Sequence, residues 1–221
     1  MSSKIYDKAF LTGCDSNTEW MLPWFLDNYH KHNDTPIILA DFGMTKFTLE
    51  ALKEQKRINA VIDVTKTKEE GWFKKPLSMR NCPSKFTCWI DTDCQVLGDI
   101  SSVFDHVEDQ KLAMVCDKPW TKRSGEIWFN SGIVAFKDKP RILDKWVQGV
   151  KDNPLRGDQE TLHYEVLKTP LDSRIYITEL PNKYNWLRVQ IENDNQDSKD
   201  KLVMHWTGKI GKDRIKGMMN G

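Results

Sequence analysis

The sequence has 221 residues, enough for one domain that buries roughly 70% of the surface its unfolded chain would expose. Its 33 basic and 32 acidic side chains give a net charge of +1, so no overall field would attract nucleic acid. No apolar run approaches the length of a membrane-spanning helix. We therefore expect neither a nucleic-acid partner nor a transmembrane segment.

The N-terminus and the cysteines bear on the cellular compartment. Residues 1–8 are polar and lack the apolar segment of a signal peptide. The five cysteines form an odd set without CxxC spacing, which argues against a disulfide framework and favours a reducing compartment. We therefore expect a soluble, cytoplasmic protein.

Strands and helices alternate in the first half of the chain. Apolar runs rich in aromatic and β-branched residues predict strands at 9–13, 36–40, 60–64 and 86–90. Apolar residues at helical spacing predict helices that begin at Thr18 and that span 46–57, 71–80 and 99–104. This rhythm needs crossover connections, so it predicts a mostly parallel sheet with helices on both faces.

The pattern changes after residue 105. We predict strands at 111–116 and 127–136, joined by a polar segment, 118–126, without a helix between them. Helices are predicted at 139–150 and 158–167, and short strands near 174–177 and 201–206. The strongly polar run 192–201 is typical of a solvated loop.

Two carboxylates, Asp91 and Asp93, stand where the strand at 86–90 ends. Residues i and i+2 point the same way in an extended chain, so both side chains can converge on one point. Like charges so placed repel each other unless a cation lies between them, and oxygen ligands suit Mg²⁺ or Mn²⁺. The alternative is a loop pair that caps the helix at 99–104.

Ligands of an open α/β sheet bind beyond the carboxyl ends of its strands. The first strand ends at Gly13 and the strand at 86–90 ends beside Asp91, so both loops belong to the same face. A diphosphate nucleotide with a divalent metal would fit there.

Several short motifs occur in a fixed order around the Asp pair. They are Lys75-Pro76-Leu77, Trp89-Ile90-Asp91-Thr92-Asp93, Phe129-Asn130-Ser131-Gly132, Gly157-Asp158-Gln159, Leu180-Pro181 with Tyr184-Asn185, and His205-Trp206-Thr207-Gly208. In content and order they resemble the metal-dependent retaining glycosyltransferases of the GT-A fold, the group that contains glycogenin and bacterial lipopolysaccharide galactosyltransferases. Small virus-encoded sugar transferases have a similar single-domain layout.

The resemblance implies an α/β protein with the Rossmann-like GT-A fold, in which helices flank a mixed, mostly parallel central sheet. It implies transfer of a hexose from a UDP-sugar to a hydroxyl of a glycan or glycoprotein acceptor, with retention of the anomeric configuration. One domain would span 1–221, with a nucleotide-binding half of about 1–105 and an acceptor half of about 106–221.

The resemblance also implies roles for single residues. Asp91, Asp93 and His205 would hold a metal ion, and one imidazole among oxygen ligands favours Mn²⁺ over the alternative, Mg²⁺. Asn130, Asp158 and Gln159 would lie at the reacting sugar. Candidate contacts of the donor are Thr12, Gly13, Asp15, Lys75, Arg80, Asp91, Thr92, Asp93, Ser131, Gly208, Lys209 and Lys212.

Two departures from the family pattern leave parts of the site open. The family places a lysine three residues after the glycine of its last motif, but this chain has Gly211 there and lysines at 209 and 212. The family's opening Thr-Leu-x-Thr-Asn-Asp is matched only loosely by residues 11–15. The phosphate-binding lysine and the identity of the base therefore stay open.

Simpler explanations exist for each candidate residue. His205 could be a satisfied histidine of a strand, Asp158 a helix N-cap, and each lysine a surface charge. Trp120 to Trp128 could face an acceptor or merely connect two strands. Asp158 could act as a nucleophile or only stabilise an oxocarbenium-like charge, and the sequence does not decide between them.

Two other functions compete with sugar transfer. A nucleotidyltransferase that makes a sugar nucleotide would need a glycine-rich, basic loop after the first strand, and residues 11–18 lack one. A non-catalytic sugar- or metal-binding module would not need the full set of motifs that this chain retains.

Overall fold

The computed structural model describes residues 5–221 and contains two sheets. The seven-stranded sheet has the order β3-β2-β1-β4-β7-β6-β8 and comprises β1 (Tyr6–Cys14), β2 (Ile37–Asp41), β3 (Ala60–Asp63), β4 (Ser84–Ile90), β6 (Leu112–Cys116), β7 (Phe129–Lys137) and β8 (Ile177–Leu180). The three-stranded sheet has the order β5-β10-β9 and comprises β5 (Cys94–Val96), β9 (Trp186–Leu187) and β10 (Val203–His205).

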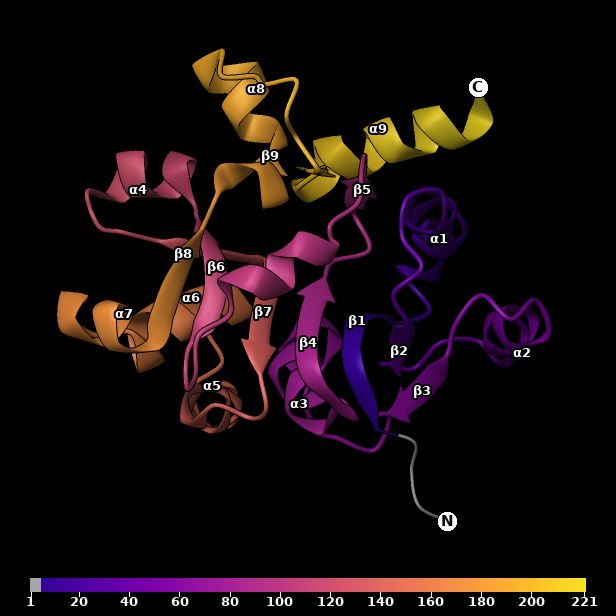
Figure 1. Cartoon of the computed structure of the whole chain (residues 1–221), viewed down its shortest axis with the longest axis horizontal. Coiled ribbons are helices and arrows are strands. Elements are labelled where there is room, and N and C mark those ends of the chain that lie inside the picture. Colours follow the sequence, from indigo (N-terminus) through magenta and orange to yellow (C-terminus); the bar gives the residue numbers. More distant parts are fainter. Residues whose placement is uncertain (1–4) are drawn as a thin grey trace.

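Helices surround the large sheet (Figure 1). They are α1 (Leu22–His30), α2 (Lys46–Glu54), α3 (Lys75–Asn81), α4 (Lys118–Ser124), α5 (Arg141–Asp152), α6 (Asp158–Thr161), α7 (Pro170–Tyr176), α8 (Arg188–Asp194) and α9 (Gly208–Asn220). Short 3₁₀ turns occur at Glu19–Met21, Gly71–Lys74, Ser101–His106 and Asn182–Tyr184, and a π-helical turn at Leu162–Val166. Within residues 5–221 no helix combines the length and apolar character needed to cross a bilayer.

The large sheet is mixed and mostly parallel, as predicted. Strands β3, β2, β1 and β4 run parallel to one another, and β6 is parallel to β8, whereas β7 runs antiparallel to both β4 and β6. Because β7 is reversed, its amino end lies at the same edge as the carboxyl ends of β1, β4 and β6. This edge is where ligands of open α/β sheets bind.

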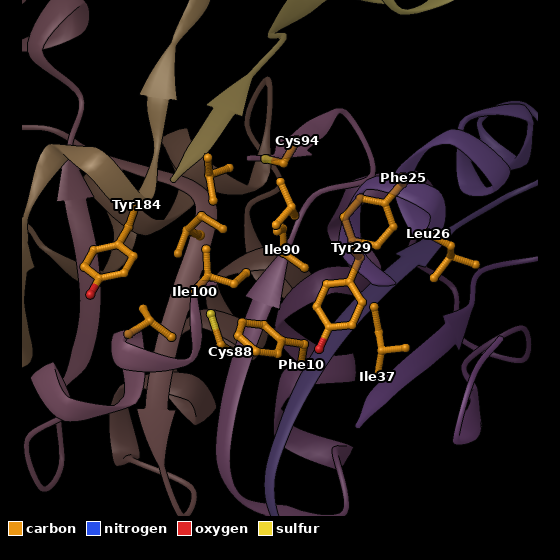
Figure 2. Close-up of a cluster of buried hydrophobic side chains, with 14 of the residues drawn as sticks. Phe10, Phe25, Leu26, Tyr29, Ile37, Cys88, Ile90, Cys94, Ile100 and Tyr184 are labelled. Carbon is orange, nitrogen blue, oxygen red and sulfur yellow. The ribbon is translucent and has the colours of Figure 1, made fainter. Parts of the chain in front are cut away.

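The inner strands are apolar over most of their length because both faces of the sheet are covered. On one face Phe10 and Ile90 pack with α1 residues such as Phe25 and Tyr29 (Figure 2). On the other face the alternate strand residues, Leu11 and Trp89 among them, pack against α3 and α5. Burial of so many aliphatic and aromatic side chains fixes the register of the strands.

Two predictions from sequence miss a helix. Residues 118–126 contain a helix, α4, whose N-cap is Asp117 and whose end is the left-handed Gly125 (φ 78°). The strand predicted near 174–177 is mostly α7, which begins with a capping box at Thr169, and β8 starts only at Ile177.

Other differences concern short or exposed elements. The polar run 192–201 begins with the last turn of α8 and only then becomes a loop. The helix predicted at 158–167 is one turn of α-helix, α6, that widens into the π-helical turn. Strand β5, strand β9 and helix α9 were not predicted.

Candidate active site

A cavity of about 730 Å³ opens at the edge of the sheet where the strand ends meet, and its size is typical of ligand sites. Most of the candidate residues predicted from sequence line it. They are Gly13, Asp15, Lys75, Asp91, Thr92, Asp93, Asn130, Ser131, Asp158, Gln159, His205, Gly208 and Lys212.

Three candidate residues lie elsewhere. Arg80 stands in the last turn of α3, five residues and about 7.5 Å along the helix axis from Lys75, and pairs with Asp144 at 2.6 Å. Lys209 is exposed and does not line the cavity. Thr12 is fully buried inside β1. These three residues therefore lie outside the cavity lining.

The two sheets bring Asp93 and His205 together. The amide N–H of Asp91 donates to Gly132 O at 2.9 Å and ends β4 against β7. Strand β5 then pairs antiparallel with β10, which sets Cys94 opposite His205. The Nε2 atom of His205 consequently lies 3.2 Å from Asp93 Oδ1 and 3.9 Å from Asp91 Oδ2.

Burial and neighbouring charges shift the pKa values of His205 and Asp93 in opposite directions. Burial alone would lower the pKa of His205, but the carboxylate of Asp93 outweighs it and raises this pKa. Burial would raise the pKa of Asp93, yet His205 holds it below its ordinary value. The pKa of Asp91 is raised by burial and by Asp93, despite the opposing charge of Lys75.

Lys75 joins two carboxylates beneath the cavity. Its Nζ lies 2.9 Å from Asp91 Oδ1 and 3.1 Å from Asp158 Oδ2, and it donates to Ser131 O at 3.2 Å. Burial would lower the pKa of Lys75, but Asp158 and Asp91 raise it. Trp89 Nε1 also donates to Asp91 at 2.6 Å. The ammonium group is thus engaged in holding the two carboxylates, and its contact with the donor stays a prediction.

A chain of buried amides fixes the tautomer of His205. The Gly132 N–H donates to Asn130 Oδ1 at 2.9 Å, which fixes the orientation of the Asn130 amide and leaves its oxygen, an acceptor, facing Asn185. Asn185 Nδ2 therefore donates to it at 2.7 Å, and Asn185 Oδ1 faces His205 Nδ1 at 3.0 Å. An amide oxygen requires a donor, so Nδ1 carries a proton. Nε2 faces the carboxylates: it donates to Asp93 while the ring is charged, and it offers its lone pair once that proton leaves.

Asp117 is a site residue that sequence reasoning missed. It is buried and accepts from Asn130 Nδ2 at 3.0 Å and from Gln159 Nε2 at 3.0 Å. Gln159 Oε1 in turn accepts from the Ser131 N–H at 3.2 Å. The only local signal was an aspartate before a proline-containing helix start, which any N-cap would share.

Glycine is required at two points of the site. A Cβ on Gly132 would overlap the imidazole of His205, so only glycine leaves room for that ring. A Cβ on Gly13 would come within 2.9 Å of both Ala40 O and the ring of Phe42. Gly13 therefore lets β1 lie close to Ala40 and Phe42, and Gly132 lets β7 lie close to the imidazole of His205.

A divalent cation fits the donor set around His205. Metal-binding atoms of Asp93, Cys94 and His205 lie within 4.8 Å of one another. Burial raises the pKa of the Cys94 thiol, which therefore stays protonated and is a poor ligand. Asp93 and His205, with Asp91 beside them, leave an oxygen and nitrogen set that suits Mn²⁺.

Solved structures share this architecture, although no protein-family model and no curated protein sequence matches the chain. The bifunctional glycosyltransferase WbbM superposes with a TM-score of 0.68 and 11% identity over 95% of this chain. GlyE from Streptococcus pneumoniae gives 0.70, 15% and 92%. The galactosyltransferase LgtC, in complex with donor and acceptor sugar analogues, gives 0.59 and 14%, with 96% of this chain and 95% of LgtC covered.

The chain has the GT-A glycosyltransferase fold. It spans 47% of the WbbM chain and 55% of the GlyE chain, about half the length of each. At 11–15% sequence identity, the likeness to these structures shows the fold alone.

Within this GT-A fold, the structure bears on the lysine that the sequence left open. Gly211 is buried in the first turn of α9, where a Cβ would overlap the carbonyl of Trp206. No side chain can therefore occupy position 211. Lys212 lines the cavity and lowers the pKa of Asp93, which makes it the better candidate for a phosphate contact.

Proposed function

We propose that the protein is a Mn²⁺-dependent glycosyltransferase that moves a hexose from a UDP-sugar to a hydroxyl of a glycan or glycoprotein, with retention of configuration. The observation that carries the proposal is the meeting of Asp93 and His205, far apart in the sequence, in a cavity at the strand ends of a GT-A fold. The choice of UDP and of retention rests on the motif resemblance.

The donor's diphosphate would lie between Asp93, His205 and Lys212. A bound divalent cation would neutralise the negative charge that develops on the leaving group. The imidazole of His205 presents Nε2 to it because Asn185 holds the proton on Nδ1. Lys212 supplies a further positive charge from α9.

The transferred sugar would lie against the amide cluster of Asn130 and Gln159, beside Asp158. The Asn130 amide is occupied within the protein, whereas Gln159 Nε2, which uses one of its two N–H groups on Asp117, can donate the other to a sugar hydroxyl. The Asp158 carboxylate can attack the anomeric carbon as a nucleophile, or it can stabilise the positive charge that develops there. Lys75 and the Trp146 indole, which donates to Asp158 O at 2.9 Å, fix the position of Asp158.

Calorimetry of UDP binding tests the proposal. We expect UDP to bind in the presence of Mn²⁺, and binding to collapse in Asp93→Ala. The matched control is Asp63→Ala, which removes an exposed aspartate at the end of β3, a strand of the same sheet, outside the cavity. Equal UDP binding with and without Mn²⁺ would contradict the proposed metal role.

A panel of UDP-hexoses then separates an enzyme from a binding module. Slow release of free sugar from one donor is expected of a transferase, and the anomeric NMR spectrum of a transfer product distinguishes retention from inversion. A protein that binds UDP but releases no sugar from any donor would be a binding module.

A further inference from the structure

A stack of side chains that the proposed donor site does not use lies beside the cavity, on α4, on the segment that follows it and on the π-helical turn Leu162–Val166. The rings of Trp120 and Trp128 lie 5.4 Å apart at 24°, and those of Trp128 and His163 lie 3.8 Å apart at 15°. The guanidinium carbon of Arg123 lies 4.8 Å from the centre of the Trp120 ring. Arg123 is therefore held against an indole that is itself braced by two further rings.

Helix α4 is fixed relative to the amide cluster. Asp117 Oδ1 caps the helix by accepting from Trp120 N at 3.1 Å. Its other oxygen accepts from Asn130 and Gln159, each at 3.0 Å. One carboxylate therefore sets the position of Arg123's helix against the groups proposed to hold the transferred sugar.

Arg123 has no acidic partner in the part of the chain that the structure describes. Among residues 5–221 no carboxylate oxygen lies within ion-pair distance of its guanidinium, although the side chain lines the cavity. Lys122, its neighbour on α4, pairs with Asp194 at 2.8 Å. Of the other cations that line the cavity, Lys75 is engaged by two aspartates and Lys212 lies near Asp93.

The order of strands separates Arg123 from the nucleotide end of the cavity. Along the sheet edge the order is β1, β4, β7, β6, so the loop after β1 and the helix after β6 stand at opposite ends. Figure 1 shows α4 and β1 on opposite sides of β4 and β7. The metal-binding residues follow β4, between these ends. A group that reaches Arg123 therefore comes from the side away from the nucleotide.

We propose that Arg123, braced on Trp120, forms an acceptor subsite for a sugar that carries an acidic group, either a carboxylate or a phosphate. A stacked guanidinium keeps its in-plane N–H groups free, and their fork geometry matches both anions. The inference rests on the proposed function, because it assigns the second substrate of the same cavity.

Binding of small glycosides in the presence of Mn²⁺ and UDP tests the subsite. The carboxylate arm compares phenyl β-D-glucuronide with phenyl β-D-glucoside, and the phosphate arm compares glucose 6-phosphate with glucose. We expect the anionic member of at least one pair to bind about tenfold more tightly, as one charge-assisted pair allows. The arm that shows the preference identifies the acidic group.

Variants on α4 make the test specific. Arg123→Gln should bring each pair to within about twofold, whereas Lys122→Gln, whose lysine already pairs with Asp194, should keep the preference. Melting temperatures and Mn²⁺-dependent UDP binding of both variants should equal those of the unmodified protein. These controls separate a lost subsite from a damaged fold.

The outcomes distinguish the two proposals. Intact Mn²⁺-dependent UDP binding with no preference in either pair, or with a preference that survives Arg123→Gln, overturns the acidic subsite alone. Failure of the unmodified protein to bind UDP with Mn²⁺ overturns the proposed function and the subsite with it.

Discussion

Replacing Asn185 with alanine should weaken metal binding through the tautomer of His205. Asn185 is fully buried, and its side chain links Asn130 to His205 Nδ1. Without the amide oxygen, the Nδ1 proton of His205 loses its acceptor, and the proton can move to Nε2, the nitrogen proposed as metal ligand. Loss of such an outer partner lowers metal affinity about 10–100-fold, or about 1.4–2.7 kcal/mol.

The same substitution should also lower the free energy of unfolding, and the contacts of Asn185 set limits to the loss. Asn130 Oδ1 keeps the Gly132 N–H as a donor, so His205 Nδ1 is the group left without a partner. One unsatisfied buried group costs about 1–3 kcal/mol. Asn33→Ala is the matched control, because Asn33 is also a buried amide and bonds Ile100 N and Gly98 O away from the cavity.

Titration with Mn²⁺ alone, followed by the electron paramagnetic resonance of the free ion, measures the affinity without requiring enzymatic activity. Urea unfolding measures the stability. Asn33→Ala should lose stability and keep its Mn²⁺ affinity. Unchanged Mn²⁺ affinity in Asn185→Ala would refute the reasoning.

Two further predictions concern the same imidazole. Asp93 raises the pKa of His205 above its ordinary value of 6.5. Because the proton on Nε2 must leave before a metal binds, Mn²⁺ affinity should rise with pH, and the midpoint of that rise should lie above pH 6.5. An affinity independent of pH would contradict this. The added methyl group of Gly132→Ala should displace the imidazole ring of His205. This should lower Mn²⁺ affinity, measured by calorimetry, at least tenfold, and the free energy of unfolding, measured in urea, by about 1–3 kcal/mol. Gly217→Ala is the control, because a Cβ there meets nothing within 4 Å, and it should change neither quantity.

The sheet and most cavity-lining candidates could be predicted because their signals are local. The carboxyl-terminal parts of strands β1 and β4, and the whole of β2, are buried on both faces, so their sequences are mostly apolar runs that end in polar turns. Asp91 and Asp93 follow such a run directly. Their placement at the sheet edge follows from strand direction alone.

The elements that were missed have weak periodicity or short length. Strands β5 and β9 have three and two residues, too few for an alternation to be seen. Helix α9 buries only Gly211 and Ile215, so it presents hardly any apolar stripe. Helix α4 did carry end signals, namely Asp117, Pro119 and Gly125, which cap chemistry alone could have identified.

The role of Lys75 could not be predicted because it depends on register between distant strands. A lysine before a strand is equally suited to a phosphate and to a carboxylate. Only the pairing of β4 with β7, and the placement of α6 behind them, sets Asp91 and Asp158 around one ammonium group. Asp117 is similar, since its two amide partners come from β7 and α6.

The charge of the cavity gives a physical reason why the proposed nucleotide would need a metal. Six carboxylates line it, against three lysine and arginine side chains. One of those cations, Lys75, is buried between Asp91 and Asp158, and another, Arg123, stands on α4 at the far end of the sheet edge. A diphosphate entering between Asp93 and Lys212 would meet mostly like charge in a partly desolvated site, where such repulsion is poorly screened. A divalent cation held by Asp93 and His205 reverses the local sign, so the metal should bind before the nucleotide.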